Sequence, residues 1–254
     1  MSQPKVLLVG ESWVSTSTHF KGWDHFQSTY YEEGSDHLLA ALRSGGIDVT
    51  HLRGHEAARD FPLELGALQG YDAVILSDVG ANTLLLHPDA FLRGERVPNR
   101  LKLIEQYVAQ GGGLLMAGGY LSFQGINAAA QFHETPVEAA LPVTMLAGDD
   151  RLEVPEGADP VVVEGGHEVL RGIDGSWPYL LGFNRLAVKE GATLLAEAEG
   201  HPLLVVGTHG RGRSAAWASD VGPHWCPMPF VSWEGYVRLF QNLVRWLAGE
   251  SRTE

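Results

Sequence analysis

Short apolar runs alternate with longer amphipathic stretches through the first half of the chain. The runs are the right length for buried strands, and most of them end at a Gly or Asp that begins a loop. The run KVLLVG, near the start of the chain, is the clearest example. This pattern predicts four strands, at residues 5–10, 48–52, 72–78 and 114–118.

The stretches between these runs predict helices. In residues 35–44 apolar side chains recur at helical spacing, and two glycines end the segment. Residues 100–110 show the same spacing on one face. Strands that alternate with helices form a parallel sheet covered on both faces, and right-handed crossovers place the strand carboxyl ends along one edge. We therefore expect an α/β fold with a ligand site at that edge.

The second half of the chain has a different pattern. Residues 142–165 are rich in Val, Pro, Gly and acidic residues, which is typical of short strands with turns. Three further strand-like runs are separated by glycine turns, and they predict an antiparallel extension of the sheet. These runs are residues 192–198, 202–208 and 213–220.

The chain ends in an amphipathic helix, predicted at residues 235–247, whose apolar side chains form one stripe. Hydrophobic residues make up 44% of the 254 positions, which is enough for a large core. No linker, repeat or low-complexity segment interrupts the sequence. We expect one domain over residues 1–254.

Charge and cysteine content narrow the classes of function. Lys and Arg number 18 against 31 Asp and Glu, and the resulting net charge of −13 argues against nucleic acid and anionic membranes as partners. No apolar run approaches the ~20 residues of a membrane-spanning helix. The single cysteine, Cys226, cannot form an intramolecular disulfide, and the first residues lack a secretory pattern. We expect a cytoplasmic protein.

Three motifs follow one another in a recognisable order. They are YDAVILSD with a glycine loop after it, then GGGLLMAGGY, then a late strand followed by a histidine. This order resembles the class I glutamine amidotransferase-like superfamily. GESW near the start and PHW…WEGY near the end are similar to one glutamine amidotransferase-like group, and trehalose-utilisation-type proteins are similar relatives. The resemblance covers nearly the whole chain and implies a flavodoxin-like three-layer sandwich with a mostly parallel sheet.

The same resemblance implies where chemistry would lie. Working amidotransferases hold a Cys nucleophile at an elbow after a strand, a His after a late strand, and an acid two residues after that His. Here the elbow position falls on Gly119 or Tyr120, the His position on His224 and the acid position on Cys226. Gly80 lies in the loop that would help form an oxyanion hole. The scaffold and one histidine match, but the elbow cysteine is missing, so ordinary glutaminase chemistry is not expected.

Polar and aromatic residues directly follow the predicted strands. Glu11 comes straight after a buried strand, where an unpaired carboxylate is costly, and is a candidate proton acceptor or base. His224 is the best single candidate for acid–base work. The alternative for each is structural: a Glu that caps the next loop, and a satisfied histidine. The candidate ligand-binding residues are Ser12, Trp13, Gly80, Gly119, Tyr120, Asp220 and Trp225.

The segment 11–34 is unusually rich in aromatic and charged residues for a connection. We interpret it as a long loop that is either a lid over the site or an ordered surface loop packed by its own aromatics. Histidine spacings that suit a metal site on a helix are absent, and the glycine-rich stretches lack the context of a phosphate loop. We expect neither a metal nor another cofactor.

Three hypotheses of function remain open. The first is a repurposed pocket that binds a small polar metabolite, such as a sugar or a carboxylate, with acid–base or hydrolytic chemistry by Glu11 and His224. The second is a non-catalytic binding or assembly module, in which Trp-rich segments form the interface of a homo-oligomer. The third is an amidase in which Cys226 is a relocated nucleophile and His224 its base.

Overall fold

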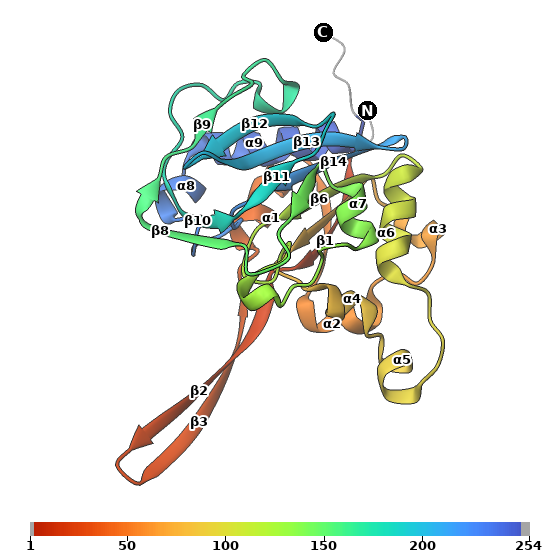
Figure 1. Ribbon diagram of the computed structural model, residues 1–254, viewed down its shortest axis with the longest axis vertical. Coiled ribbons are helices and arrows are strands. Elements are labelled where there is room, and N and C mark those ends of the chain that lie inside the picture. The colour runs from red at the N-terminus through yellow and green to blue at the C-terminus, as the bar shows by residue number, and fades with distance from the viewer. Residues whose placement is uncertain (1–2, 250–254) are drawn as a thin grey trace.

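An eight-stranded sheet forms the centre of the computed structural model, which describes residues 3–249 (Figure 1). Five neighbouring strands are parallel: β4 (Asp48–Leu52), β1 (Lys5–Gly10), β5 (Ala73–Ser77), β6 (Gly113–Ala117) and β14 (Gly212–Trp217). Three antiparallel strands continue it: β13 (His201–His209), β12 (Thr193–Ala198) and β9 (Val161–Val162). The expected α/β fold, with a mostly parallel sheet and an antiparallel extension, is confirmed.

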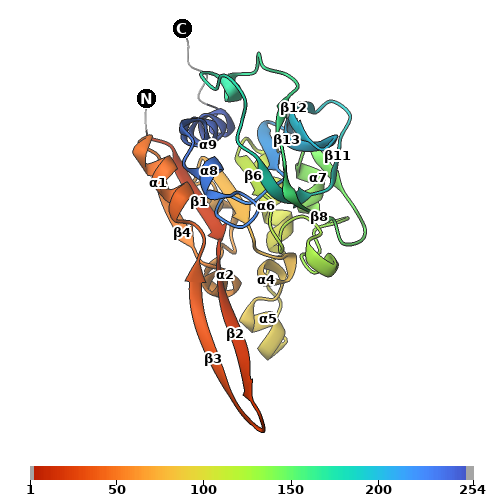
Figure 2. The same ribbon diagram turned by 90° about the vertical axis from the view of Figure 1, so that its left-hand side faces the viewer.

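Helices cover both faces of this sheet (Figure 2). One layer consists of α1 (Asp36–Ser44) and α9 (Glu234–Leu247), which pack against each other. The other consists of α2 (Gly54–Asp60), α3 (Leu65–Leu68), α4 (Ala81–Leu85) and α6 (Arg100–Ala109). The order of the parallel strands by position in the chain, second, first, third, fourth, fifth, is the flavodoxin-like order.

Smaller elements complete the body. Two short antiparallel pairs are β7 (Val143–Met145) with β11 (Leu186–Val188), and β8 (Arg151–Ala158) with β10 (Leu180–Asn184). The remaining helices are α5 (Pro88–Arg93), α7 (Pro136–Ala140) and α8 (Met228–Val231), with single 3₁₀ turns at Ile126–Ala128 and Glu168–Leu170.

The core explains why the apolar runs predicted strands so well. Every residue of β5 and β6 is buried, because helices cover both faces of the parallel sheet. The predicted stripe of the last helix is also confirmed, since Tyr236, Leu239 and Leu243 of α9 are buried against the sheet. Long, regular burial of this kind leaves a clear periodic signal in the sequence.

The prediction of an irregular loop at residues 11–34 is wrong. The segment forms a β-hairpin of β2 (Ser12–Lys21) and β3 (Asp24–Glu33), joined by a two-residue turn at Gly22 and Trp23. The hairpin projects from the body in both views (Figures 1 and 2). Most of its side chains are exposed on both faces, so the usual alternation of apolar and polar residues that marks a strand is weak.

A buried arginine ties the helices of one layer together. The guanidinium of Arg100, at the start of α6, donates hydrogen bonds to the carbonyl oxygens of Leu84 at 2.5 Å, Ala58 at 2.9 Å and Ala57 at 3.1 Å. Burial lowers the pKa of Arg100 to about 10, so the group remains charged at neutral pH. These carbonyls come from α2 and α4, near the ends of the helices, where the helix dipole favours a cation.

We expect Arg100→Met to lower the free energy of unfolding by about 3 kcal/mol, because several buried carbonyl groups would lose their donor. Urea denaturation followed by circular dichroism measures the change. Arg96→Met is the control, since Arg96 is exposed. A loss no greater than that of the control would show that Arg100 does not hold the helices together.

Candidate functional site

The carboxyl ends of β1, β5 and β14 meet at one edge of the sheet, and an acidic residue follows each of them. Glu11 directly follows β1, Asp78 directly follows β5, and Asp220 lies three residues after β14. In the sheet, the next parallel strand of the chain, β4, lies on one side of β1, and the one after it, β5, lies on the other. The carboxyl ends of β1 and β5 therefore form the topological switch point, where such sheets bind ligands.

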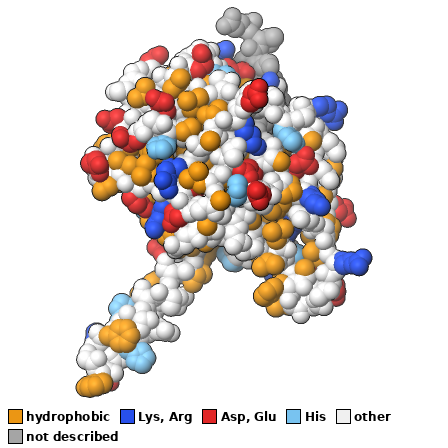
Figure 3. All heavy atoms as spheres, viewed as in Figure 1, with side chains coloured by type: hydrophobic (Ala, Val, Ile, Leu, Met, Phe, Trp, Pro, Cys, Tyr) orange, Lys and Arg blue, Asp and Glu red, His pale blue; other side chains and the backbone are white. Residues whose placement is uncertain are grey.

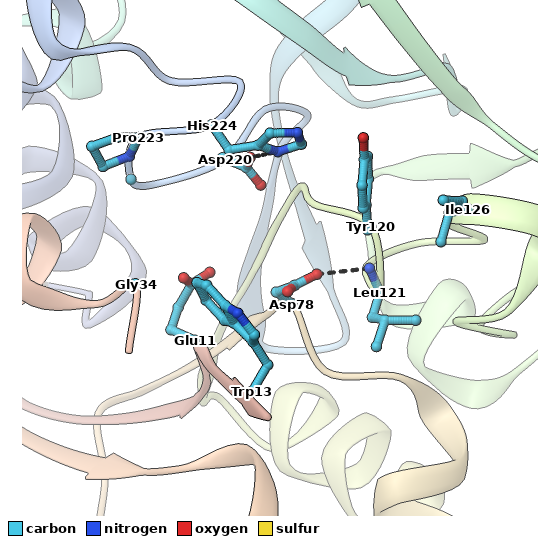
Figure 4. Close-up of a pocket in the computed structure, with 11 residues that line it drawn as sticks. Glu11, Trp13, Gly34, Asp78, Tyr120, Leu121, Ile126, Asp220, Pro223 and His224 are labelled. Atoms are coloured by element: carbon cyan, nitrogen blue, oxygen red, sulfur yellow. Dashed lines mark hydrogen bonds and ion pairs between the residues drawn. The ribbon is translucent and has the colours of Figure 1, made fainter. Parts of the chain in front are cut away.

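A cavity of about 510 Å³ lies over this point (Figure 4). Acidic groups and His224 face one another across it, and aromatic and aliphatic side chains form parts of its wall. Its volume suits a small molecule. The lining residues are Glu11, Trp13, Gly34, Asp78, Tyr120, Leu121, Ile126, Asp220, Gly222, Pro223 and His224.

Glu11 is held in an unusual backbone conformation at the base of the cavity. Its φ is +50°, a left-handed value that costs energy for a residue with a side chain. Its N–H donates to the Ser77 carbonyl at 3.0 Å, and its carbonyl accepts from the Gly34 N–H at 3.0 Å. The Ser77 hydroxyl donates to Oε1 of Glu11 at 2.5 Å. Two strands and the return of the hairpin thus fix this one residue.

The environment of Glu11 favours its protonated form. The side chain is buried, and burial together with the negative charges of Asp78 and Asp220 raises its pKa from 4.5 to about 8. The hydrogen bond from Ser77 opposes this shift but does not cancel it. At neutral pH Glu11 therefore carries a proton.

Asp78 is the second carboxyl group of the cavity, partly buried, and it titrates lower than Glu11. Burial, with the negative charge of Asp220, raises its pKa to about 6. The Leu121 N–H, which donates to Oδ1 at 2.7 Å, opposes the shift by stabilising the carboxylate (Figure 4). Asp78 also has a left-handed φ of +46°. At neutral pH Asp78 is mainly ionised beside a protonated Glu11.

Asp220 and His224 form an ion pair on the opposite wall. Oδ2 of Asp220 accepts from Nδ1 of His224 at 2.8 Å and from the Trp225 N–H at 3.0 Å. The hydrogen bond to Asp220 raises the pKa of His224, against the effect of its partial burial. His224 is half-exposed, so its ring is accessible from the cavity.

Two aromatic rings pack beside His224. Tyr120 meets the His224 ring edge-on with centroids 4.7 Å apart, and meets the Trp225 ring at 5.4 Å. Glu153 on β8 fixes both, because its two oxygens accept from the Tyr120 hydroxyl and from Nε1 of Trp225, each at 2.9 Å. The Glu153 carboxylate therefore fixes the orientation of both aromatic rings.

Carboxylates occupy the space that an elbow nucleophile would need. Gly119 has a φ of +143°, and a Cβ atom built there would lie 2.9 Å from Oδ1 of Asp78 and 2.9 Å from Oδ1 of Asp220. Asn184 holds the turn by accepting from the Gly119 N–H at 3.0 Å and donating to its carbonyl at 3.2 Å. No side chain fits at this position without displacing the acids.

The structure brings some predicted site residues together and separates others. Glu11, Trp13, Tyr120, Asp220 and His224 all line the cavity. The other predicted contacts lie outside the lining: Ser12 accepts from the Gly54 N–H at 2.8 Å, Gly80 faces the backbone of Ala129 and Ala130, Gly119 lies beneath the carboxylates, and Trp225 is buried behind Tyr120.

The environment of Cys226 opposes its predicted role as a nucleophile. Its side chain is fully buried, and burial raises the pKa of the thiol well above its ordinary value. A reactive thiolate needs accessible, electropositive surroundings. The physical reason for the difference is that Cys226 points into the core rather than toward the cavity, whose lining does not include it.

Two residues of the candidate site were not predicted from the sequence, Asp78 and Glu153. Asp78 follows a buried strand just as Glu11 does, so the same signal was present at its position. Glu153 lies on β8, outside the main sheet, and no sequence spacing connects it with Tyr120 or Trp225. Among residues 3–249, no group of three or more His, Cys, Asp or Glu side chains is arranged to hold a metal ion.

Comparisons with known proteins agree with the motif order. A family model described as "Putative glutamine amidotransferase" matches residues 5–249. The cytoplasmic protein STM1381 of Salmonella typhimurium LT2 is 45% identical, with a TM-score of 0.93 over 96% of this chain and 99% of that one. The cytoplasmic protein STM3548 of Salmonella typhimurium is 41% identical, with a TM-score of 0.93 over 95% and 98%.

More distant structures share the fold alone. A ThuA-like protein from Parabacteroides merdae is 14% identical, with a TM-score of 0.58 over 100% of this chain and 93% of that one. The predicted relation to trehalose-utilisation-type proteins is thus supported at the level of fold. No curated protein matches the chain. Within the described residues, no helix combines the length and apolar character that a membrane crossing requires.

The pKa of Glu11 predicts a pH-dependent contribution to stability. Because the folded protein retains a proton that the unfolded chain releases above pH 4.5, this contribution is complete below that pH and is lost as the pH rises through about 8. Glu11→Gln cannot ionise. As the pH rises from 5 to 8, the unfolding free energy of the variant should therefore increase relative to that of wild type by a few kcal/mol, at about 1.4 kcal/mol per pKa unit. Urea titrations at several pH values measure this, with the exposed Glu190→Gln as control. A difference that stays constant over this range would contradict the assignment.

We expect the Cys226 thiol of the folded protein to resist iodoacetamide from pH 6 to 9, at a rate that His224→Ala does not change, because the thiol is buried and protonated. Mass spectrometry of the alkylated protein measures the rate, and protein unfolded in urea is the control that must react fully. Rapid alkylation below pH 7 that slows in His224→Ala would reveal a thiolate–imidazole pair and would revive the amidase hypothesis.

Proposed function

We propose that this chain, which belongs to the family described as "Putative glutamine amidotransferase", binds a small polar metabolite at the carboxyl edge of its sheet and performs acid–base chemistry on it. One observation carries the proposal: in one cavity, the surroundings raise the pKa of the buried Glu11 to about 8 and that of the partly buried Asp78 to about 6, on opposite sides of neutrality. Pairs of titratable groups that their surroundings separate in this way are typical of acid–base catalysis.

Each group then has a distinct role at neutral pH. Glu11 is the proton donor, because it remains protonated up to about pH 8. Asp78 is the proton acceptor, because it is mainly ionised above about pH 6. His224, paired with Asp220 through the hydrogen bond that raises its pKa, is a second donor that stabilises negative charge as it develops on the ligand.

The charge of the cavity selects the class of ligand. Asp78 and Asp220 are only partly balanced by His224, so an anionic metabolite would be repelled. A neutral polyhydroxylated compound or an amine fits better. Trp13 and Tyr120 offer aromatic surface, against which the C–H face of a sugar-like ring can pack. Of the two ligand classes considered from the sequence, this favours a sugar over a carboxylate.

Ordinary glutaminase activity is not part of this proposal. Of the two candidate elbow residues, Gly119 has no side chain, with no room for one beside the acids, and Tyr120 carries a phenol rather than a thiol. Cys226 is buried outside the cavity. The two Salmonella relatives are named as cytoplasmic proteins, and we place the chain in the same compartment.

A second candidate function, a non-catalytic assembly module, is favoured by a different observation. The β2–β3 hairpin exposes several aromatic side chains far from the body, which is typical of an interaction surface. It does not compete with the first proposal, since the hairpin and the cavity share only the root of the hairpin.

A ligand screen tests the proposed function. We expect neutral sugars, polyols or amines, rather than carboxylates, to raise the melting temperature at pH 7, and hits to be converted in a reaction followed by NMR. Glu11→Gln and His224→Ala should each reduce turnover about 10²–10⁴-fold. Asp78→Asn should do the same. Glu190→Gln, which removes an exposed carboxylate outside the cavity, should leave turnover unchanged. If Glu11→Gln and His224→Ala both left binding and turnover intact, the site would be misassigned.

A further inference from the structure

The β2–β3 hairpin, hereafter the arm (residues 12–33), has a surface that its own chain does not cover. Both strands are 10 residues long, and the arm stands clear of the body in both ribbon views (Figures 1 and 2). In the space-filling view, hydrophobic and histidine side chains lie exposed at its outer end (Figure 3). Phe20 is 75% exposed and Trp23, at the tip, is fully exposed.

The arm is attached to the body at its root. Arg53 forms an ion pair with Glu33 at 2.6 Å, and Tyr31 meets the His55 ring edge-on at 5.3 Å. A two-stranded hairpin is at best marginally stable alone in water. Its exposed aromatics would gain most from burial against another surface, and the outer edge of β2 still has free backbone groups.

The sequence of β2 is self-complementary about its central residue, Ser17. When a second copy of β2 runs antiparallel to the first with Ser17 on the two-fold axis, Lys21 of each copy opposes Trp13 of the other. Phe20 then opposes Val14, and the two flanking threonines oppose each other. Each of these is a favourable cross-strand pair, and the first is a cation–π pair.

We infer that two copies of this chain associate through their arms, with β2 paired antiparallel to β2 about Ser17 in a four-stranded sheet. The other edge of the arm is less suited to this. Self-pairing of β3 about Ser28, the register partner of Ser17, would oppose Asp24 and Glu32 and place like charges together. Within the described residues β2 pairs with no strand except β3, so its outer edge is open to another strand.

This pairing brings the tip of one arm to the cavity of the other chain. Trp13, which opposes Lys21 of the second copy, is a lining residue of the cavity. The neighbouring Trp23 then lies at the mouth of an acidic cavity, next to a cationic side chain. The charge of Lys21 is complementary to that of the cavity, which holds Asp78 and Asp220. The association itself does not rest on the proposed chemistry, and oligomeric state tests it separately.

Sedimentation velocity tests the association with variants that introduce a charge at the proposed interface and then an opposite charge across it. Wild type should sediment as a dimer at micromolar concentration. Phe20→Glu should be a monomer at the same concentration, and adding Val14→Lys should restore the dimer, because the two positions meet only between chains. Phe91→Glu is the matched control: Phe91 is a 69%-exposed phenylalanine on α5, outside the arm, and the variant should remain a dimer. A monomeric wild type, or a dimer that survives Phe20→Glu, would overturn the inference.

Disulfide trapping tests the register in a Cys226→Ala background. Residues on the two-fold axis of an antiparallel pair have Cα atoms about 4.5–5.5 Å apart, within reach of a disulfide. Ser17→Cys should thus give a covalent dimer when oxidised glutathione accepts the electrons of the two thiols, and Ser28→Cys on β3 should not. Preferential trapping of Ser28→Cys would overturn the proposed edge. Binding of a monomeric wild type to phosphatidylcholine vesicles, seen as a blue shift of tryptophan fluorescence, would assign the arm to a membrane and also overturn it.

Discussion

The arrangement of the site depends on one constraint: three acidic side chains converge at the carboxyl ends of β1, β5 and β14, where burial and mutual repulsion oppose the ionisation of Glu11 and Asp78. Glu11 relieves the repulsion by keeping its proton, and Ser77 holds that side chain in place. The left-handed backbone at Glu11 and Asp78 turns both residues off their strands toward the same cavity. The strain at these two positions is offset by the hydrogen bonds that the neighbouring strands and turns supply.

The absence of a nucleophile at the elbow and the presence of the acidic cluster are linked, because the two would occupy the same space. In the amidotransferase resemblance, the elbow residue carries the reactive side chain. Here the turn keeps its small residues, but Asp78 and Asp220 approach Gly119 so closely that a side chain there would collide with both. A cysteine at this position would also face two carboxyl groups, which disfavour a thiolate. In the proposed function, the chemistry is therefore carried by several side chains around the elbow rather than by one at the elbow itself.

The parts of the molecule that could be predicted from the sequence are those with a regular pattern of apolar residues or a fixed place at the end of a strand. Buried strands such as β5 and the stripe of α9 leave a periodic apolar pattern, and residues after parallel strands must gather at one edge, so Glu11 and His224 could be placed together. The arm was missed because neither face of it is buried, which removes the alternation that marks a strand. Glu153 could not be found because its approach to Tyr120 depends on how a separate small sheet packs against the main one.

The two residues that flank the arm are joined directly, because the Gly34 N–H donates to the carbonyl of Glu11. The chain leaves the body at Ser12 and returns to it beside the same point. The 22 residues between Glu11 and Gly34 thus contribute no strand to the eight-stranded sheet. The arm is in this sense an insertion whose length the body does not constrain. In the inferred dimer, its length is set instead by the distance from its root to the cavity of the second chain.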